Sequence, residues 1–146
     1  DWMKVKNMVD FFADFYESFD RNKAYDMLGR LQISENQPLK TMSKGTKEKV
    51  QLILVMSRNA DLYFLDEPIG GVDPAAREYI LDTIITNYHE NATVILSTHL
   101  IADIERILDE VVFISQGNIV LTPTVDETRE KEDKSVDALF REVFRC

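Results

Sequence analysis

Leu62-Tyr63-Phe64-Leu65-Asp66-Glu67-Pro68 is the stretch that decides how this chain is expected to fold. Its four consecutive hydrophobic residues, two of them aromatic, predict a strand that is buried on both faces of a parallel sheet. Pro68 cannot donate a ladder hydrogen bond, so the strand is expected to end at the two carboxylates. Asp66 and Glu67 would then lie at the carboxyl edge of the sheet, where open α/β folds bind their ligands.

Two adjacent acids at the end of a buried strand are costly unless a cation meets them. Magnesium that carries a phosphate is the obvious candidate for that cation. The alternative is a strand that ends in two solvated acids at a turn. This stretch alone favours neither interpretation, so the rest of the chain has to decide between them.

The composition is that of an ordinary globular protein with one domain. The chain has 146 residues, of which 45% are hydrophobic and 29% are charged, enough for one sizeable core. Its formal net charge of -9 argues against a surface that binds the phosphate backbone of a nucleic acid. The single cysteine, Cys146, offers no disulfide framework and is consistent with a reducing, cytoplasmic setting. No hydrophobic run is long enough to span a bilayer, so we expect a partner to provide any membrane span.

Two amphipathic helices are predicted in the first 40 residues. Hydrophobic residues recur at helical spacing over residues 4–19, and Asp20 is placed to cap a second helix that ends near Leu31. The aromatic face of the first helix is either core or a docking face for another protein, and core is the safer interpretation.

The segment Ser43-Lys44-Gly45-Thr46-Lys47 is expected to open a further helix, which runs to about Arg58 and is buried from Val50 to Met56. Gly45 allows close approach to the backbone, and the helix start presents unpaired amides beside the positive end of the dipole. That geometry suits a phosphate. Taken alone, however, Ser43 or Thr46 is more simply an ordinary helix cap.

A strand, a helix and a second strand are predicted over residues 62–98. Asp73 followed by Pro74 is typical of a helix start, which gives Asp73 a complete structural explanation. Thr93–Thr98 is the second buried strand, and its connection through a helix implies parallel pairing. His99 is therefore expected at the same sheet edge as the two acids. The helix between the strands is expected to bury Ile80, Leu81, Ile84, Ile85 and Tyr88.

The remaining elements are a helix over Leu100–Leu108 and a β-hairpin that turns at Gln116-Gly117. Residues 126–134 are rich in charge and predict a solvated linker or an exposed helix. A C-terminal amphipathic helix follows them.

Four motifs now stand in order along the chain: Ser43–Lys47, Leu62–Glu67, Gly71-Val72-Asp73 and Ser97-Thr98-His99. Their order and spacing resemble the second half of an ATP-binding cassette ATPase. They look like that family's signature motif, its Walker B strand with the catalytic glutamate, its D-loop and its switch histidine. The resemblance covers roughly residues 1–122, and the run from Leu65 to Pro74 looks closest to bacterial transporter ATPases.

The resemblance implies an α/β fold of the P-loop NTPase class, with a helical subdomain and a parallel-sheet core. Residues 1–59 would form the helical subdomain with the signature motif, and residues 60–125 the C-terminal half of the ATPase core. Residues 126–146 would be the charged linker and C-terminal helix. No Gly-x-x-x-x-Gly-Lys-Ser/Thr run occurs in the chain. We therefore expect a fragment that lacks the N-terminal part of the core and is inactive by itself.

Roles in ATP hydrolysis follow from the resemblance for three residues near the sheet. Asp66 would hold Mg²⁺ through water. Glu67 would orient or deprotonate the attacking water, and His99 would contact the γ-phosphate of ATP.

Other roles concern a second cassette in a head-to-tail dimer. Ser43 and Gly45 would touch the γ-phosphate bound by that second cassette, and Asp73 would couple the two sites. The family signature usually reads Leu-Ser-Gly-Gly-Gln. Here Lys44 replaces the first glycine and adds a cation near the phosphate, whereas Thr46 cannot supply the amide of the glutamine.

The function implied by the resemblance is that of the nucleotide-binding subunit of a membrane transporter. That subunit would use ATP and Mg²⁺, pair with a transmembrane permease, and lie at the cytoplasmic face of the cell membrane. One alternative is a non-transport ATPase of the same family that acts in repair or translation. Family members that maintain chromosomes carry long coiled coils ahead of the signature motif, whereas residues 1–40 show no sustained heptads. The other is a non-catalytic interaction module that uses the helical face around Phe11–Phe19, which Glu67 and His99 together argue against.

Overall fold

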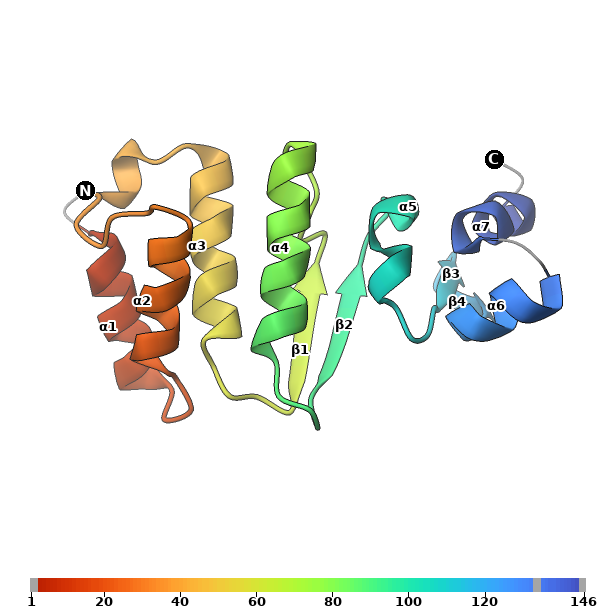
Figure 1. Ribbon diagram of the computed structural model, residues 1–146, viewed down its shortest axis with the longest axis horizontal. Helices are drawn as coiled ribbons and strands as arrows, with labels where there is room; N and C mark the ends of the chain where they lie inside the picture. The colour runs from red at the N-terminus through yellow and green to blue at the C-terminus, as the bar shows by residue number, and fades with distance from the viewer. Residues whose placement is uncertain (1–2, 133–134, 145–146) are drawn as a thin grey trace. The chain divides into compact units, whose positions relative to one another are not determined.

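The structure is a computed structural model that describes residues 3–132 and 135–144. The chain divides into two compact units, Asp1–Thr98 and His99–Cys146 (Figure 1).

The first unit carries a group of helices and a parallel pair of strands. The helix α3 packs against α1, α2 and α4 (Figure 1). In chain order the elements are α1 (Val5–Phe15), α2 (Arg21–Arg30), a 3-10 turn (Leu39–Thr41), α3 (Lys44–Met56), β1 (Leu62–Asp66), α4 (Pro74–Asn87) and β2 (Thr93–Ser97).

The loop between α1 and α2 is tied to the end of α3. The Asp20 side chain caps α2 by accepting a hydrogen bond from the backbone amide of Lys23 at 3.0 Å. The Asp20 amide donates to the carbonyl oxygen of Ser57 at 2.7 Å, and the Asn59 amide donates to that of Ser18 at 2.8 Å. The two predicted helices and the Asp20 cap are thus confirmed, and backbone bonds join this pair of helices to α3.

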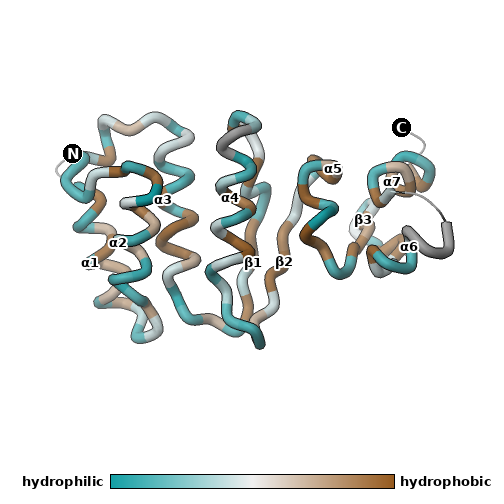
Figure 2. Tube along the Cα trace, in the orientation of Figure 1, coloured by the Kyte–Doolittle hydropathy of each residue, from teal (hydrophilic) through white to brown (hydrophobic). Residues whose placement is uncertain are grey.

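The second half of α3 is the hydrophobic centre of the first unit (Figure 2). This confirms the buried helix predicted for that segment, although α3 ends at Met56, two residues before the expected end. Its buried residues are Val50, Leu52, Ile53, Leu54 and Met56.

The strands β1 and β2 pair in parallel, as the strand–helix–strand pattern predicted, with Leu62 opposite Thr93 and Asp66 opposite Ser97. The prediction that both faces are buried is wrong for the described residues. Tyr63 is 3% exposed, but Phe64 is 69% exposed, because successive side chains of a strand point to opposite faces and only one face is covered. The same holds for β2, where Ile95 is exposed.

The helix α4 buries fewer residues than expected. Ile80, Leu81 and Ile84 are buried, whereas Ile85 and Tyr88 are exposed. Ile85 follows Ile84 and is therefore turned about 100° away from it around the helix axis.

The second unit is built around a β-hairpin. The predicted helix over Leu100–Leu108 is split into a short α-helix and a 3-10 turn. The elements are α5 (Ile101–Ile104), a 3-10 turn (Glu105–Ile107), β3 (Phe113–Ser115), β4 (Asn118–Leu121), α6 (Val125–Glu132) and α7 (Val136–Phe144).

The turn of the hairpin has positive φ at both central residues, 48° at Gln116 and 76° at Gly117, which matches the two-residue turn that the sequence predicted. The helix α6 falls in the segment expected to be a linker or exposed helix, of which residues 133–134 lie outside the described residues. The core of this unit consists of Ile101, Phe113, Val125, Val136 and Leu139.

Among the residues that the structure describes, no helix combines the length and the hydrophobicity needed to cross a membrane.

Candidate functional site

The register of the parallel sheet sets the position of Asp66. This residue ends β1, its side chain is exposed, and its partner across the ladder is Ser97, the last residue of β2. Side chains of directly paired residues project from the same face of a sheet. The Ser97 hydroxyl donates a hydrogen bond to Asp66 Oδ1, so the carboxylate at the strand end is held by its neighbour.

Glu67 follows directly and is held by the same residue. Its backbone amide donates to the carbonyl oxygen of Ser97 at 3.0 Å and also lies 3.2 Å from Ser97 Oγ. Glu67 then adopts a φ of +46°, in the left-handed region that costs a non-glycine residue about 1–2 kcal/mol. The hydrogen bonds from Glu67 to the end of β2 help to stabilise this conformation.

A tight turn follows Glu67, and a glycine fits it closely. The Gly70 amide donates to the Glu67 carbonyl oxygen at 2.9 Å. A Cβ at Gly70 would lie 3.2 Å from that oxygen and 3.5 Å from Glu67 Oε2. A side chain there would therefore crowd the backbone carbonyl of Glu67 and would contact its carboxylate.

The acids at this edge suit magnesium. Oxygen ligands are those that Mg²⁺ prefers, and it is commonly bound through one or two carboxylates together with phosphates rather than by an all-protein cage. Asp66 offers such a carboxylate in an exposed position. In residues 3–132 and 135–144 the structure shows no group of three or more His, Cys, Asp or Glu side chains that could hold a metal alone. Asp66 can therefore supply one carboxylate ligand to Mg²⁺.

The segment before α3 forms a helix cap. Ser43 Oγ accepts a hydrogen bond from the Thr46 amide at 3.2 Å and lies 2.9 Å from Thr46 Oγ1. This confirms the simpler interpretation of Ser43, while a contact between this loop and a phosphate stays a prediction.

Lys44 and Gly45 both lie in the first turn of α3. The Lys44 side chain is 91% exposed, and its Nζ is 3.7 Å from Glu48 Oε1. A Cβ at Gly45 would meet no atom within 4 Å. The backbone of this turn is therefore open to an approaching group.

Asp73 stands directly before α4, which begins at Pro74 as predicted. Its carbonyl oxygen accepts a hydrogen bond from the Arg77 amide at 3.0 Å. A role for Asp73 between two cassettes stays a prediction.

His99 is exposed and is the first residue of the second unit, two positions after Ser97. The structure brings Asp66, Glu67 and Ser97 together within the first unit. The predicted approach of His99 to the two acids stays a prediction.

Ser97 is the residue that sequence reasoning missed. One signal could have indicated it. It is the polar last residue of a hydrophobic strand that was expected to pair in parallel with the strand ending at Asp66. Its contact with the carboxylate depends on the register, which the sequence pattern does not specify.

Comparison with known proteins identifies relatives over most of the chain. Residues 10–102 match the family described as "AAA domain, putative AbiEii toxin, Type IV TA system". The ABC transporter ATP-binding protein YtrB of Bacillus subtilis is 30% identical over 132 residues, which are 90% of this chain and 45% of that protein. The ABC-type transporter ATP-binding protein EcsA of Bacillus subtilis is 33% identical over 106 residues, which are 70% of this chain and 43% of that protein.

Solved structures show the same likeness. The ATP-binding subunit of an ABC transporter superposes with a TM-score of 0.80 at 26% identity, covering 97% of this chain and 62% of the other. An ATP-binding cassette known as MJ1267 superposes with a TM-score of 0.66 at 21% identity, covering 84% of this chain and 49% of the other, and supports the fold alone. The chain spans about half the length of the curated relatives it matches.

Proposed function

This chain belongs to the AAA-domain family that matches it and, more narrowly, to the ATP-binding cassette ATPases, and from that premise we propose its function. It supplies the signature-to-switch half of a nucleotide-binding subunit that hydrolyses ATP to drive transport across a membrane. The observation that carries this proposal is the pair Asp66 and Glu67, held at the end of a parallel strand by Ser97. The relatives described above are transporter proteins, which supports transport over a role in repair or translation.

In this proposal the two acids have different tasks. Asp66 holds Mg²⁺ through water, and the ion, when bound, neutralises charge on the phosphates. Glu67 orients or deprotonates the attacking water, which requires its carboxylate at hydrogen-bond distance from that water. His99 contacts the γ-phosphate. Phosphoryl transfer depends mainly on placement and electrostatic stabilisation, and these groups provide both.

The start of α3 serves the second cassette of a head-to-tail dimer. Ser43, Gly45 and the exposed amides of the first turn approach the γ-phosphate bound there, because a helix start attracts anions. Lys44 adds a positive charge beside that site, and Thr46 supports the loop through its contacts with Ser43. Asp73 couples the two sites.

In this proposal the chain has three parts, which correspond to those of the family. Residues 1–59 form the helical subdomain, residues 60–125 the C-terminal half of the ATPase core, and residues 126–146 a charged linker with a C-terminal helix. The partners are a transmembrane permease and a second cassette, without nucleic acid, at the cytoplasmic face of the cell membrane.

The test is Glu67→Gln in the complete cassette, with ATP binding and hydrolysis measured separately. Because a positioned base contributes about 10²–10⁴-fold to rate, we expect ATP to bind while hydrolysis falls by at least about 100-fold. Glu90→Gln is the matched control, since Glu90 is exposed in the loop before β2 and its loss should leave the rate unchanged. Unchanged turnover in Glu67→Gln would remove Glu67 from its role.

A second measurement concerns the 146-residue chain alone. No phosphate-cradling loop occurs in its sequence, so a calorimetric titration with ATP and Mg²⁺ should show no saturable binding. Clear binding would mean that the chain contains a phosphate site elsewhere, with Ser43–Thr46 the first segment to re-examine.

A further inference from the structure

Ser97 contacts both acids. Its hydroxyl donates to Asp66 Oδ1 and lies 3.2 Å from the backbone nitrogen of Glu67, which donates to it. One hydroxyl can both donate and accept, so a single side chain joins the carboxylate of one acid to the backbone of the next.

The first half of this contact orients Asp66. A carboxylate has two oxygens, and donation to Oδ1 restrains the plane of the group without using Oδ2. Asp66 is exposed at the end of β1, where a carboxylate without such a bond would sample several rotamers. The Ser97 hydroxyl thus reduces the conformational freedom of this side chain before any ion arrives.

The second half supports the backbone of Glu67. The positive φ of this residue persists only where the surroundings hold it, and the Glu67 amide has two acceptors on Ser97, the carbonyl oxygen at 3.0 Å and Oγ at 3.2 Å. The direction in which the Glu67 side chain leaves the strand depends on that backbone conformation. Removing Oγ leaves one of the two acceptors.

We propose that Ser97 is a positioning residue for ATP hydrolysis, whose hydroxyl sets the mutual placement of the Asp66 carboxylate and Glu67. This rests on the proposed function, because it gives Ser97 a task in the reaction assigned to the two acids. Ser97 itself touches neither nucleotide nor water in this proposal. It acts through its two hydrogen bonds.

The experiment compares three substitutions that separate the hydroxyl from the shape of the side chain. Ser97→Thr keeps the hydroxyl, Ser97→Val has the shape of threonine without it, and both are β-branched and suit a strand. Thr93→Val is the matched control, because Thr93 lies four residues earlier on the same exposed face of β2 and is paired with Leu62, away from the acids.

Two readouts are taken. In the complete cassette, Ser97→Val should lower kcat by at least about tenfold while the KM for ATP changes by less than about threefold, because misplacement of reacting groups affects the transition state more than binding. Ser97→Thr should keep most of the wild-type rate, and Thr93→Val should not change it.

The second readout uses the 146-residue chain. Exchange of the Glu67 amide with deuterium, followed by mass spectrometry, should be faster in Ser97→Val and close to wild type in Ser97→Thr.

The outcomes separate this inference from the proposed function. A wild-type cassette without ATPase activity would defeat the proposed function, while the exchange measurement, which needs no nucleotide, would still test the hydrogen bond. If wild type is active and Ser97→Val matches it in kcat and in Glu67 exchange, Ser97 is no positioning residue. If Ser97→Thr loses as much activity as Ser97→Val, the hydroxyl is not the cause, and the proposal is likewise wrong.

Discussion

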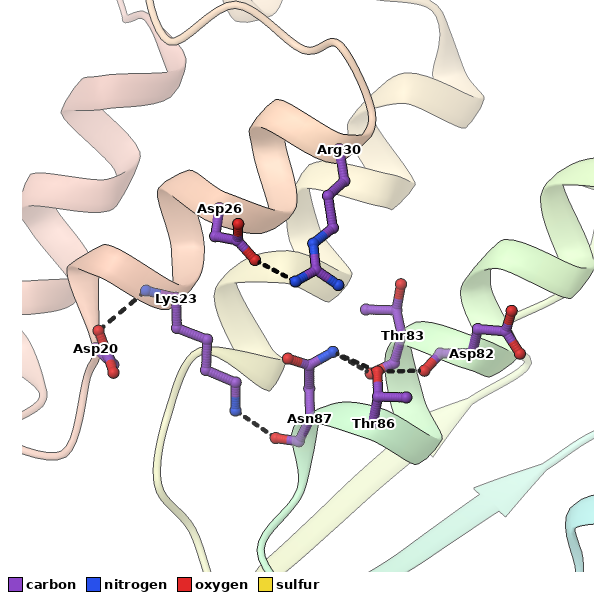
Figure 3. Close-up of polar contacts among 8 residues, drawn as sticks. All are labelled: Asp20, Lys23, Asp26, Arg30, Asp82, Thr83, Thr86 and Asn87. Carbon is purple, nitrogen blue, oxygen red and sulfur yellow. Dashed lines mark hydrogen bonds and ion pairs between the residues drawn. The ribbon is translucent and has the colours of Figure 1, made fainter.

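Lys23 Nζ, on α2, donates a hydrogen bond to the backbone carbonyl oxygen of Asn87, the last residue of α4, although 64 positions separate the two residues (Figure 3). The last carbonyls of a helix lack partners within the helix, and its C-terminal end attracts positive charge. The Asn87 side chain also bonds back to the carbonyl oxygen of Thr83 at 2.8 Å. Lys23 therefore links the helical region to the end of the helix between the two strands.

Replacing Lys23 with methionine should destabilise the first unit. The variant keeps most of the aliphatic stem but loses the charged donor, so we expect the free energy of unfolding to fall by about 1 kcal/mol. Arg30→Met is the control, because Arg30 pairs with Asp26 of its own helix, at 2.8 Å in an exposed position, and such pairs contribute about 0.5 kcal/mol or less. Denaturant titrations would measure both, and equal losses would contradict a special role for Lys23.

The contribution of Lys23 to the free energy of unfolding should also depend on pH. Burial lowers the pKa of Lys23 from its usual 10.5, and nearby Asp20 opposes this shift. Folding therefore releases a proton at pH values between the folded pKa and 10.5, so the contribution of Lys23 to stability rises with pH across this window. Below the window Lys23 is charged in both states, and its contribution does not change with pH. Tyr25, whose pKa is raised by burial and then by Asp10 and Glu35, has the opposite dependence.

Subtracting the unfolding free energy of Lys23→Met from that of wild type removes the contribution of Tyr25, which both proteins share. This difference should grow as the pH rises toward 10.5. A difference that is flat or falls with pH would contradict the assignment.

Gly45 and Gly29 provide a matched pair of helical glycines. Neither would bring a Cβ within 4 Å of another atom, and alanine is favoured over glycine in helices by up to about 1 kcal/mol. Both Gly→Ala variants should therefore be at least as stable as wild type. Only Gly45→Ala should slow ATP hydrolysis by the complete cassette, because its methyl group would stand where the γ-phosphate approaches the first turn of α3. Equal rates for the two variants would argue against that approach.

Two substitutions of Ser43 can separate its role as a helix cap from a contact with phosphate. Ser43→Ala removes the bond to the Thr46 amide and should cost about 1 kcal/mol of stability. Ser43→Asp keeps a good cap but places a negative charge beside the proposed phosphate. We expect Ser43→Asp to melt close to wild type and yet to hydrolyse ATP at least about tenfold more slowly in the complete cassette. Hydrolysis at the wild-type rate would leave Ser43 as a cap alone.

The local features of the chain were predictable because they depend on neighbouring residues. Asp20 caps a helix through an amide three residues away, and the Gln116-Gly117 turn has the backbone that its sequence favours. Asp66 and Glu67 were expected at a strand end because Pro68 cannot extend the ladder. The family resemblance rested on the same short motifs.

The burial of hydrophobic residues followed the sequence pattern only in part. The run Leu62–Leu65 predicted two covered faces. A strand presents alternate residues on opposite sides, however, and its own residues do not show which side other segments cover. Phe64 is exposed and Tyr63 is buried because of where other segments pack. That information lies outside the strand.

The sequence by itself determined the type and order of most of the elements, the parallel pairing of the two strands, and the placement of Asp66 and Glu67 where β1 ends. The tertiary structure decided which residues that are far apart in the sequence come into contact. Ser97 reaches Asp66 because of the strand register, and Lys23 reaches Asn87 because α2 and α4 both pack on α3. The physical reason is that helix caps, turns and strand ends depend on a few adjacent residues. Long-range contacts depend on how all the hydrophobic faces pack at once.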